Sequence, residues 1–107
     1  MYKKKFIANH SVDEIYNIAK NDGRWSDLFK INSLEEAMND FRLNDAIMVI
    51  KRDRLKEKID YQGSNEFRPV RIIIRNKKWG IEDGFHRIIA HKLLRLKDIP
   101  CEIKIED

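Results

Sequence analysis

The residues best suited to chemistry gather in one short stretch, Glu82-Asp83-Gly84-Phe85-His86-Arg87. A short apolar run precedes this stretch and a helical pattern follows it, which predicts a strand-to-helix turn. Free backbone N–H groups and the positive end of the helix dipole would then face one spot, which favours an anion. Arginine adds a planar fork of donors that fits phosphate. The stretch therefore predicts a phosphate site, and the alternative is a helix capped by Asp83 with a surface Arg87.

Five of the six residues of this turn have a predicted role. Gly84 lets the backbone turn and approach the phosphate, which Arg87 and His86 bind. If the protein is an enzyme, His86 and Asp83 are the predicted catalytic residues, because His86 can move a proton near neutral pH. Glu82 and Asp83 form an adjacent acid pair that suits Mg²⁺ beside phosphate oxygens. The alternatives are a surface His86 and a solvated Glu82.

Three segments also resemble a known family. They are the turn Gly84-Phe85-His86-Arg87-Ile88-Ile89-Ala90, the later stretch Lys97-Asp98-Ile99-Pro100-Cys101-Glu102-Ile103, and the upstream Arg68-Pro69-Val70-Arg71-Ile72-Ile73-Ile74. In this order they are similar to the Gly-x-x-Arg-x-x-Ala turn, the return into a strand and the Pro-initiated strand of the ParB/sulfiredoxin superfamily. The resemblance covers about residues 46–107, and residues 1–45 match no pattern that we recognise.

The resemblance implies a nucleotide-phosphate site at residues 82–87 and leaves the reaction open. Relatives of this minimal type are linked to nucleotide-hydrolase, nuclease and small-molecule kinase activities, and the implied cofactor is ATP or CTP with Mg²⁺. Two departures from the motif of the family reduce the number of expected activities. Phe85 stands where sulfiredoxins have their reactive cysteine, and Phe85-His86 replaces the Glu-Arg pair of chromosome-partitioning ParB proteins. Sulfinic-acid reduction and clamp-type CTP hydrolysis are therefore not expected.

The alternative function is a non-catalytic DNA-binding or regulatory module, of the kind carried by mobile elements and phages. Its phosphate contacts would come from basic residues around a predicted hairpin, namely Arg68, Arg71, Arg75, Lys77 and Lys78. Arg68 and Arg71 are also candidates for the nucleotide site. Charge favours an anionic partner in both cases, because residues 46–107 hold fifteen Lys/Arg against ten Asp/Glu. The expected partners are thus nucleotide, DNA or both, and a homodimer is left open.

Length and composition limit the class of protein. The 107 residues, 37% of them charged, predict a single domain with one modest core. No apolar run reaches the roughly 18–20 residues that span a bilayer, and no secretory signal is evident. We therefore expect no membrane partner and a cytoplasmic location. The lone Cys101 excludes an internal disulfide and a multi-cysteine zinc site.

The elements that must position the turn can be predicted from hydrophobic spacing. Capping boxes at Ser11 and Ser33 predict two helices within residues 1–45, the first ending near Gly23. The apolar run at 46–50 predicts a strand, and the polar residues 51–66 predict a loop. Further strands are predicted at 70–75, 79–82 and 99–105, and the helix of the motif at 84–96.

These elements predict an α+β (or α/β) fold of the ParB/sulfiredoxin type. A small mixed β-sheet carries the motif helix on one face, and a helical N-terminal part, residues 1–45, joins a core formed by residues 46–107. The buried stripe of the second helix is predicted to be Leu34, Ala37, Met38 and Phe41. His91 is predicted to be solvated, and Cys101 to be buried on the apolar side of the last strand.

Overall fold

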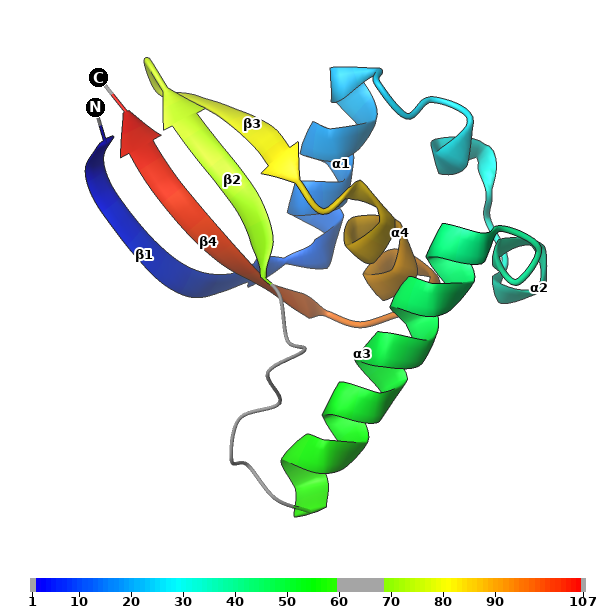
Figure 1. Ribbon diagram of the computed structural model, residues 1–107. Helices are drawn as coiled ribbons and strands as arrows, with labels where there is room; N and C mark the ends of the chain where they lie inside the picture. Colours follow the sequence, from blue (N-terminus) through cyan, green and yellow to red (C-terminus); the bar gives the residue numbers. More distant parts are fainter. Residues whose placement is uncertain (1, 60–68, 107) are drawn as a thin grey trace.

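A computed structural model describes residues 2–59 and 69–106 of the chain (Figure 1). Its elements are β1 (Tyr2–Ser11), α1 (Val12–Asp22), a 3-10 turn (Leu28–Lys30), α2 (Leu34–Ala37), α3 (Phe41–Ile59), β2 (Val70–Arg75), β3 (Lys78–Asp83), α4 (Phe85–Leu93) and β4 (Asp98–Glu106). The predicted α+β class is therefore confirmed. None of the described helices combines the length and the apolarity that crossing a membrane requires.

The sheet has the strand order β1-β4-β2-β3. β2 runs parallel to β4, whereas β1 pairs antiparallel with β4 and β3 pairs antiparallel with β2. The predicted mixed sheet is thus present, and three of its strands match the predicted segments 70–75, 79–82 and 99–105. α4, the predicted motif helix, packs between α1 and α3 beside the sheet (Figure 1).

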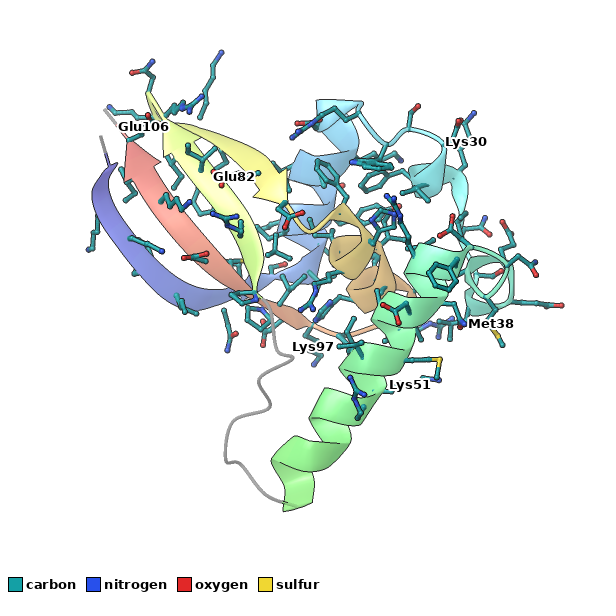
Figure 2. All side chains as sticks on the ribbon, viewed as in Figure 1. Lys30, Met38, Lys51, Glu82, Lys97 and Glu106 are labelled. Atoms are coloured by element: carbon teal, nitrogen blue, oxygen red, sulfur yellow. The ribbon has the colours of Figure 1, made fainter. Side chains whose placement is uncertain are left out.

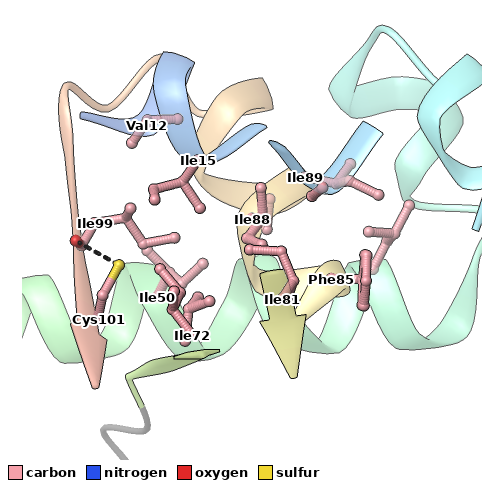
Figure 3. Close-up of a cluster of buried hydrophobic side chains, with 14 of the residues drawn as sticks. Val12, Ile15, Ile50, Ile72, Ile81, Phe85, Ile88, Ile89, Ile99 and Cys101 are labelled. Carbon is pink, nitrogen blue, oxygen red and sulfur yellow. Dashed lines mark hydrogen bonds between the residues drawn. The ribbon is translucent and has the colours of Figure 1, made fainter. Parts of the chain in front are cut away.

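Alternation along the strands separates a core face from an outer face. Ile99, Cys101 and Ile103 of β4 are fully buried beneath the helices, while Glu102 between them lies on the outer face. Isoleucines and valines from α1, α4 and the sheet meet on the core face (Figure 3). This packing holds β3, α4 and the turn between them in a defined position.

The prediction of a strand at residues 46–50 is wrong, because this run lies inside the 19-residue helix α3. Leu43, Ile47 and Ile50 are buried at helical spacing, whereas Met48 is 62% exposed. A short apolar run fits a buried strand and a helix equally well, and here packing against α4 decides. Residues 51–59, predicted as loop, continue the same helix, and the rest of that segment lies outside the described residues.

The N-terminal part is not purely helical, because residues 2–11 form the edge strand β1. The helix that follows is confirmed: Ser11 accepts a hydrogen bond from the Glu14 N–H, and Gly23 ends α1. Ser33 caps α2 as predicted, but α2 has only four residues. Its predicted buried stripe is wrong except for Ala37, since Leu34, Met38 and Phe41 are all exposed.

Candidate phosphate-binding site

A pocket of about 270 Å³ lies between the first turns of α3 and the turn that joins β3 to α4. Four of the predicted site residues line it: Asp83, Gly84, His86 and Arg87. The facing residues of α3 are Phe41, Arg42, Asp45, Ala46 and Val49, and Pro69 completes the wall. The structure therefore brings most of the predicted turn to one concave surface and adds charged residues from a second helix.

Gly84 has a structural requirement at this turn. Its φ of 111° lies in the left-handed region, which disfavours a side chain. A Cβ at this position would lie 3.1 Å from Val70 Cγ2 and 3.2 Å from Val70 Cα. The turn therefore presses directly against β2. Gly84 also occupies the N-cap position that the alternative interpretation of the turn gave to Asp83, and Asp83 is the last residue of β3.

The start of α4 has no side-chain cap among the described residues. The N–H groups of the first turn of a helix lack partners within the helix, and the helix dipole places partial positive charge there. Phe85 is buried and fixes this start, with the Arg24 guanidinium 4.9 Å from its ring centre. The next two residues, His86 and Arg87, are half-buried and line the pocket.

His86, on the first turn of α4, occupies a partly desolvated position. Its ring makes an edge contact with Trp25, with the two centroids 5.1 Å apart. Burial lowers the pKa of His86, Arg42 lowers it further, and Asp40 and Asp83 oppose the shift. The imidazole is therefore neutral at pH 7, a form that can accept a proton from a reacting group or donate one hydrogen bond.

The backbone of Arg87 is held by His91, one turn further along α4. The Nδ1 of His91 donates to the Arg87 carbonyl oxygen at 2.6 Å. His91 is buried, so the prediction of a solvated position is wrong. This contact fixes the turn of helix from which the Arg87 side chain reaches the pocket.

The β2–β3 pairing shifts register at this point, because Ile72 lies opposite Ile81 whereas Arg71 lies opposite Asp83. Glu82, the extra residue of β3 at this bulge, does not line the pocket. Its carboxylate lies 3.2 Å from Arg71 Nη2 and 3.3 Å from Lys104 Nζ on the outer face of the sheet. Figure 2 shows Glu82 over the sheet, away from α3, where Lys51 is labelled. The structure thus does not bring the predicted metal pair of Glu82 and Asp83 to one place.

Asp45 supplies the second pocket carboxylate instead. Asp45 and Asp83 face the pocket from α3 and from the end of β3, respectively. Two carboxylates together with phosphate oxygens are a normal Mg²⁺ environment. Within the described ranges, no group of three or more His, Cys, Asp or Glu side chains could hold a metal by itself. A metal here would therefore depend on a phosphate ligand.

The basic hairpin surface lies on a different part of the molecule. Arg71 contacts Glu82 and also lies 3.6 Å from Glu102, so it does not reach the pocket. Arg75 likewise forms an ion pair, with Glu106. Nucleic acid would have to compete with these carboxylates. Lys77 and Lys78 are exposed at the hairpin turn, and Arg68 lies outside the described residues.

Sequence reasoning missed Phe41, Arg42 and Asp45, because the predicted strand at 46–50 concealed the start of α3. A usable signal was present. The carboxylate of Asp40 accepts hydrogen bonds from the N–H groups of Arg42 and Leu43, both at 3.0 Å, as an N-cap residue does. An acidic cap followed by apolar residues at helical spacing is a recognisable helix start.

Comparisons of the chain with family models, with curated proteins and with solved structures gave no match. The functional argument therefore depends on the geometry of the pocket.

Proposed function

We propose that the pocket between α3 and the 83–87 turn binds the phosphate of a nucleotide or of nucleic acid. The observation that carries the proposal is that two arginines from different elements, Arg42 and Arg87, line one small pocket at the uncapped start of α4. Guanidinium groups and first-turn N–H groups are the donors that phosphate prefers. The resemblance of this turn to the ParB/sulfiredoxin superfamily supports the same location.

The size and the charges of the pocket favour a particular kind of ligand. A volume of about 270 Å³ is small beside ligand pockets of roughly 300–1,000 Å³, so it suits one nucleotide unit better than a large cofactor. Asp45 and Asp83 would repel a bare phosphate, which favours a phosphate that arrives with Mg²⁺. ATP or CTP with Mg²⁺, or one phosphate of a nucleic acid, fits this description.

The same residues could support phosphoryl transfer. Arg87 would hold the phosphate, and Asp45 and Asp83 would hold Mg²⁺, which neutralises phosphate charge when it is bound. His86, neutral at pH 7, is the residue in the pocket that could accept a proton from an attacking hydroxyl or water. Hydrolysis, strand cleavage and transfer to a small molecule all use these roles.

Arg87→Ala tests the proposal most directly. It should weaken nucleotide or oligonucleotide binding about 10- to 100-fold, because a hydrogen-bonded contact to a charged group contributes roughly 1.5–3 kcal/mol. Thermal melting with ATP, CTP or short oligonucleotides, each with and without Mg²⁺, measures the effect. A ligand at 100 times its dissociation constant should stabilise the wild-type protein by about 2.7 kcal/mol. Arg87→Lys should restore binding only in part.

Arg95→Ala is the matched control, because Arg95 is an exposed arginine beyond the other end of α4. It should bind ligand as the wild type does. The free energy of unfolding of ligand-free Arg87→Ala should change by only about 0–1 kcal/mol, as for other partly exposed charges. Unchanged ligand binding by Arg87→Ala, or its failure to fold, would contradict the proposal.

A second prediction tests whether Mg²⁺ binds the pocket pair, Asp45 and Asp83, or the pair expected from the sequence, Glu82 and Asp83. Asp45→Asn or Asp83→Asn should weaken Mg²⁺-dependent nucleotide binding by about tenfold, the effect of one charge-assisted contact. Binding without Mg²⁺ should stay the same or become tighter, because a charge that repels phosphate has been removed. Titration with nucleotide in the presence and absence of Mg²⁺ measures both effects. Glu82→Gln should leave both unchanged, and loss of Mg²⁺ dependence in that variant alone would place the metal on the outer face.

A further inference from the structure

Phe41 lies at the rim of the pocket with its ring almost entirely in solvent, at 87% exposure. Phe41 is the first residue of α3. The carboxylate of Asp40 caps this helix start by accepting hydrogen bonds from the N–H groups of Arg42 and Leu43. Between Phe41 and Arg52, the part of α3 whose side chains the structure describes, the buried residues are Leu43, Ile47 and Ile50. Neither the cap nor the core therefore uses the aromatic ring.

The surroundings of the ring are charged. Arg42 follows Phe41 directly, and Arg87 and His86 line the same pocket from α4. An exposed aromatic ring beside phosphate-binding groups is the arrangement by which proteins bind unpaired nucleotides: the phosphate is held by charge, and the base stacks on the ring. Met38 and Met48 are also exposed, at 65% and 62%, but neither lines the pocket, whereas Phe41 shares the pocket with Arg42, His86 and Arg87.

We propose that Phe41 stacks on an unpaired nucleobase of the ligand whose phosphate lies in the pocket. This inference rests on the proposed function and narrows it to a ligand with a free base. Such a base comes from a mononucleotide or from a single strand. Duplex DNA is disfavoured, because its bases are stacked on one another and offer no free face.

The test compares ligands that differ only in their bases. A labelled single-stranded oligonucleotide, the same strand with abasic positions, a duplex of the same sequence and a mononucleotide are titrated at one salt concentration. Phe41→Ala should weaken binding of the base-bearing strand about tenfold. Binding of the abasic strand should not change, because its phosphates remain. Phe41→Trp should bind the base-bearing strand at least as tightly as the wild type.

Ile7→Thr is the control variant, because Ile7 is 68% exposed on β1 and does not line the pocket. It should bind all four ligands as the wild type does. Equal Phe41 dependence for the mononucleotide and the strand shows that one nucleotide unit is enough for stacking, and dependence for the strand alone assigns the ligand to nucleic acid. Both outcomes support stacking.

Other outcomes overturn the inference, and they can be told apart. If Arg87→Ala weakens binding of base-bearing and abasic strands but Phe41→Ala weakens neither, the stacking role is wrong and the phosphate site stands. If no ligand shows Arg87-dependent binding, the proposed function fails and the inference fails with it. A lower solution mass for Phe41→Ala than for the wild type would instead assign the ring to a self-contact.

Discussion

Gly84→Ala should lower the free energy of unfolding by about 2–6 kcal/mol. Two costs combine in this estimate. An alanine at φ 111° is strained, which costs about 1–3 kcal/mol, and its Cβ would press on Val70, which adds roughly the 1–3 kcal/mol typical of overpacking. The nearest backbone atom, Val70 Cα, belongs to β2 and cannot move without disturbing the sheet. Urea unfolding followed by circular dichroism measures the loss.

Gly23→Ala is the matched control, because Gly23 also has a positive φ, of 82°, but no heavy atom lies within 4 Å of a Cβ placed there. It should cost only about 1–2 kcal/mol, the strain of the left-handed conformation alone. Equal losses in the two variants would mean that Gly84 does not pack tightly on β2. The turn would then be less constrained than the pocket geometry requires.

Cys101 should react with thiol reagents at least about a thousand times more slowly in the folded protein than in denaturant. It lies on the central strand β4, opposite Ala8 of β1 and Val70 of β2, and is fully buried. Burial raises the pKa of the Cys101 thiol from 9.0 to about 12, which lowers the reactive thiolate fraction about a thousandfold at pH 8. The Sγ also donates to the Ile99 carbonyl oxygen (Figure 3). Labelling kinetics at pH 8, with and without denaturant, measure the ratio.

The same pKa shift predicts how stability depends on pH. The folded thiol holds its proton up to about pH 12, whereas the unfolded thiol ionises near pH 9. The unfolded state therefore binds fewer protons between these values, and stability falls by about 1.4 kcal/mol per pH unit there. Cys101→Ala removes this contribution, so its stability should fall less steeply above pH 9 than that of the wild type. Fast labelling of the native protein would instead indicate a one-residue slip of β4, which would turn Glu102 inward.

Several elements that position the site could be predicted from local sequence patterns. The β-branched run Val70–Arg75 and the alternation in Asp98–Glu106 identified two strands, and the spacing of Ile88, Ile89 and Leu93 identified α4. Glycine at position 84, between a strand and a helix, marked the turn. These signals are short in range, because each depends on the conformational preference of one residue or on the period of one element.

The wall of the pocket that α3 forms could not be predicted from local sequence patterns. Residues 46–50 have the composition of a buried strand, and only their packing against α4 shows that they are helical. The error concealed the start of α3 and with it Phe41, Arg42 and Asp45. β1 was missed for a similar reason, since its lysine-rich sequence becomes a strand by pairing with β4.

The sequence by itself determined the strand-to-helix turn, its glycine, the charged residues around it and the α+β class, because these follow from local conformational preference and spacing. Only the tertiary structure decided which charges meet. Glu82 pairs with Arg71 and Lys104 on the outer face of the sheet, and Asp83, beside the register shift of β3 against β2, lines the pocket. Packing of α3 against α4 placed Asp45 opposite Asp83, 38 positions apart in the chain. Contacts over such separations are set by how whole elements bury their apolar faces, and no local pattern encodes them.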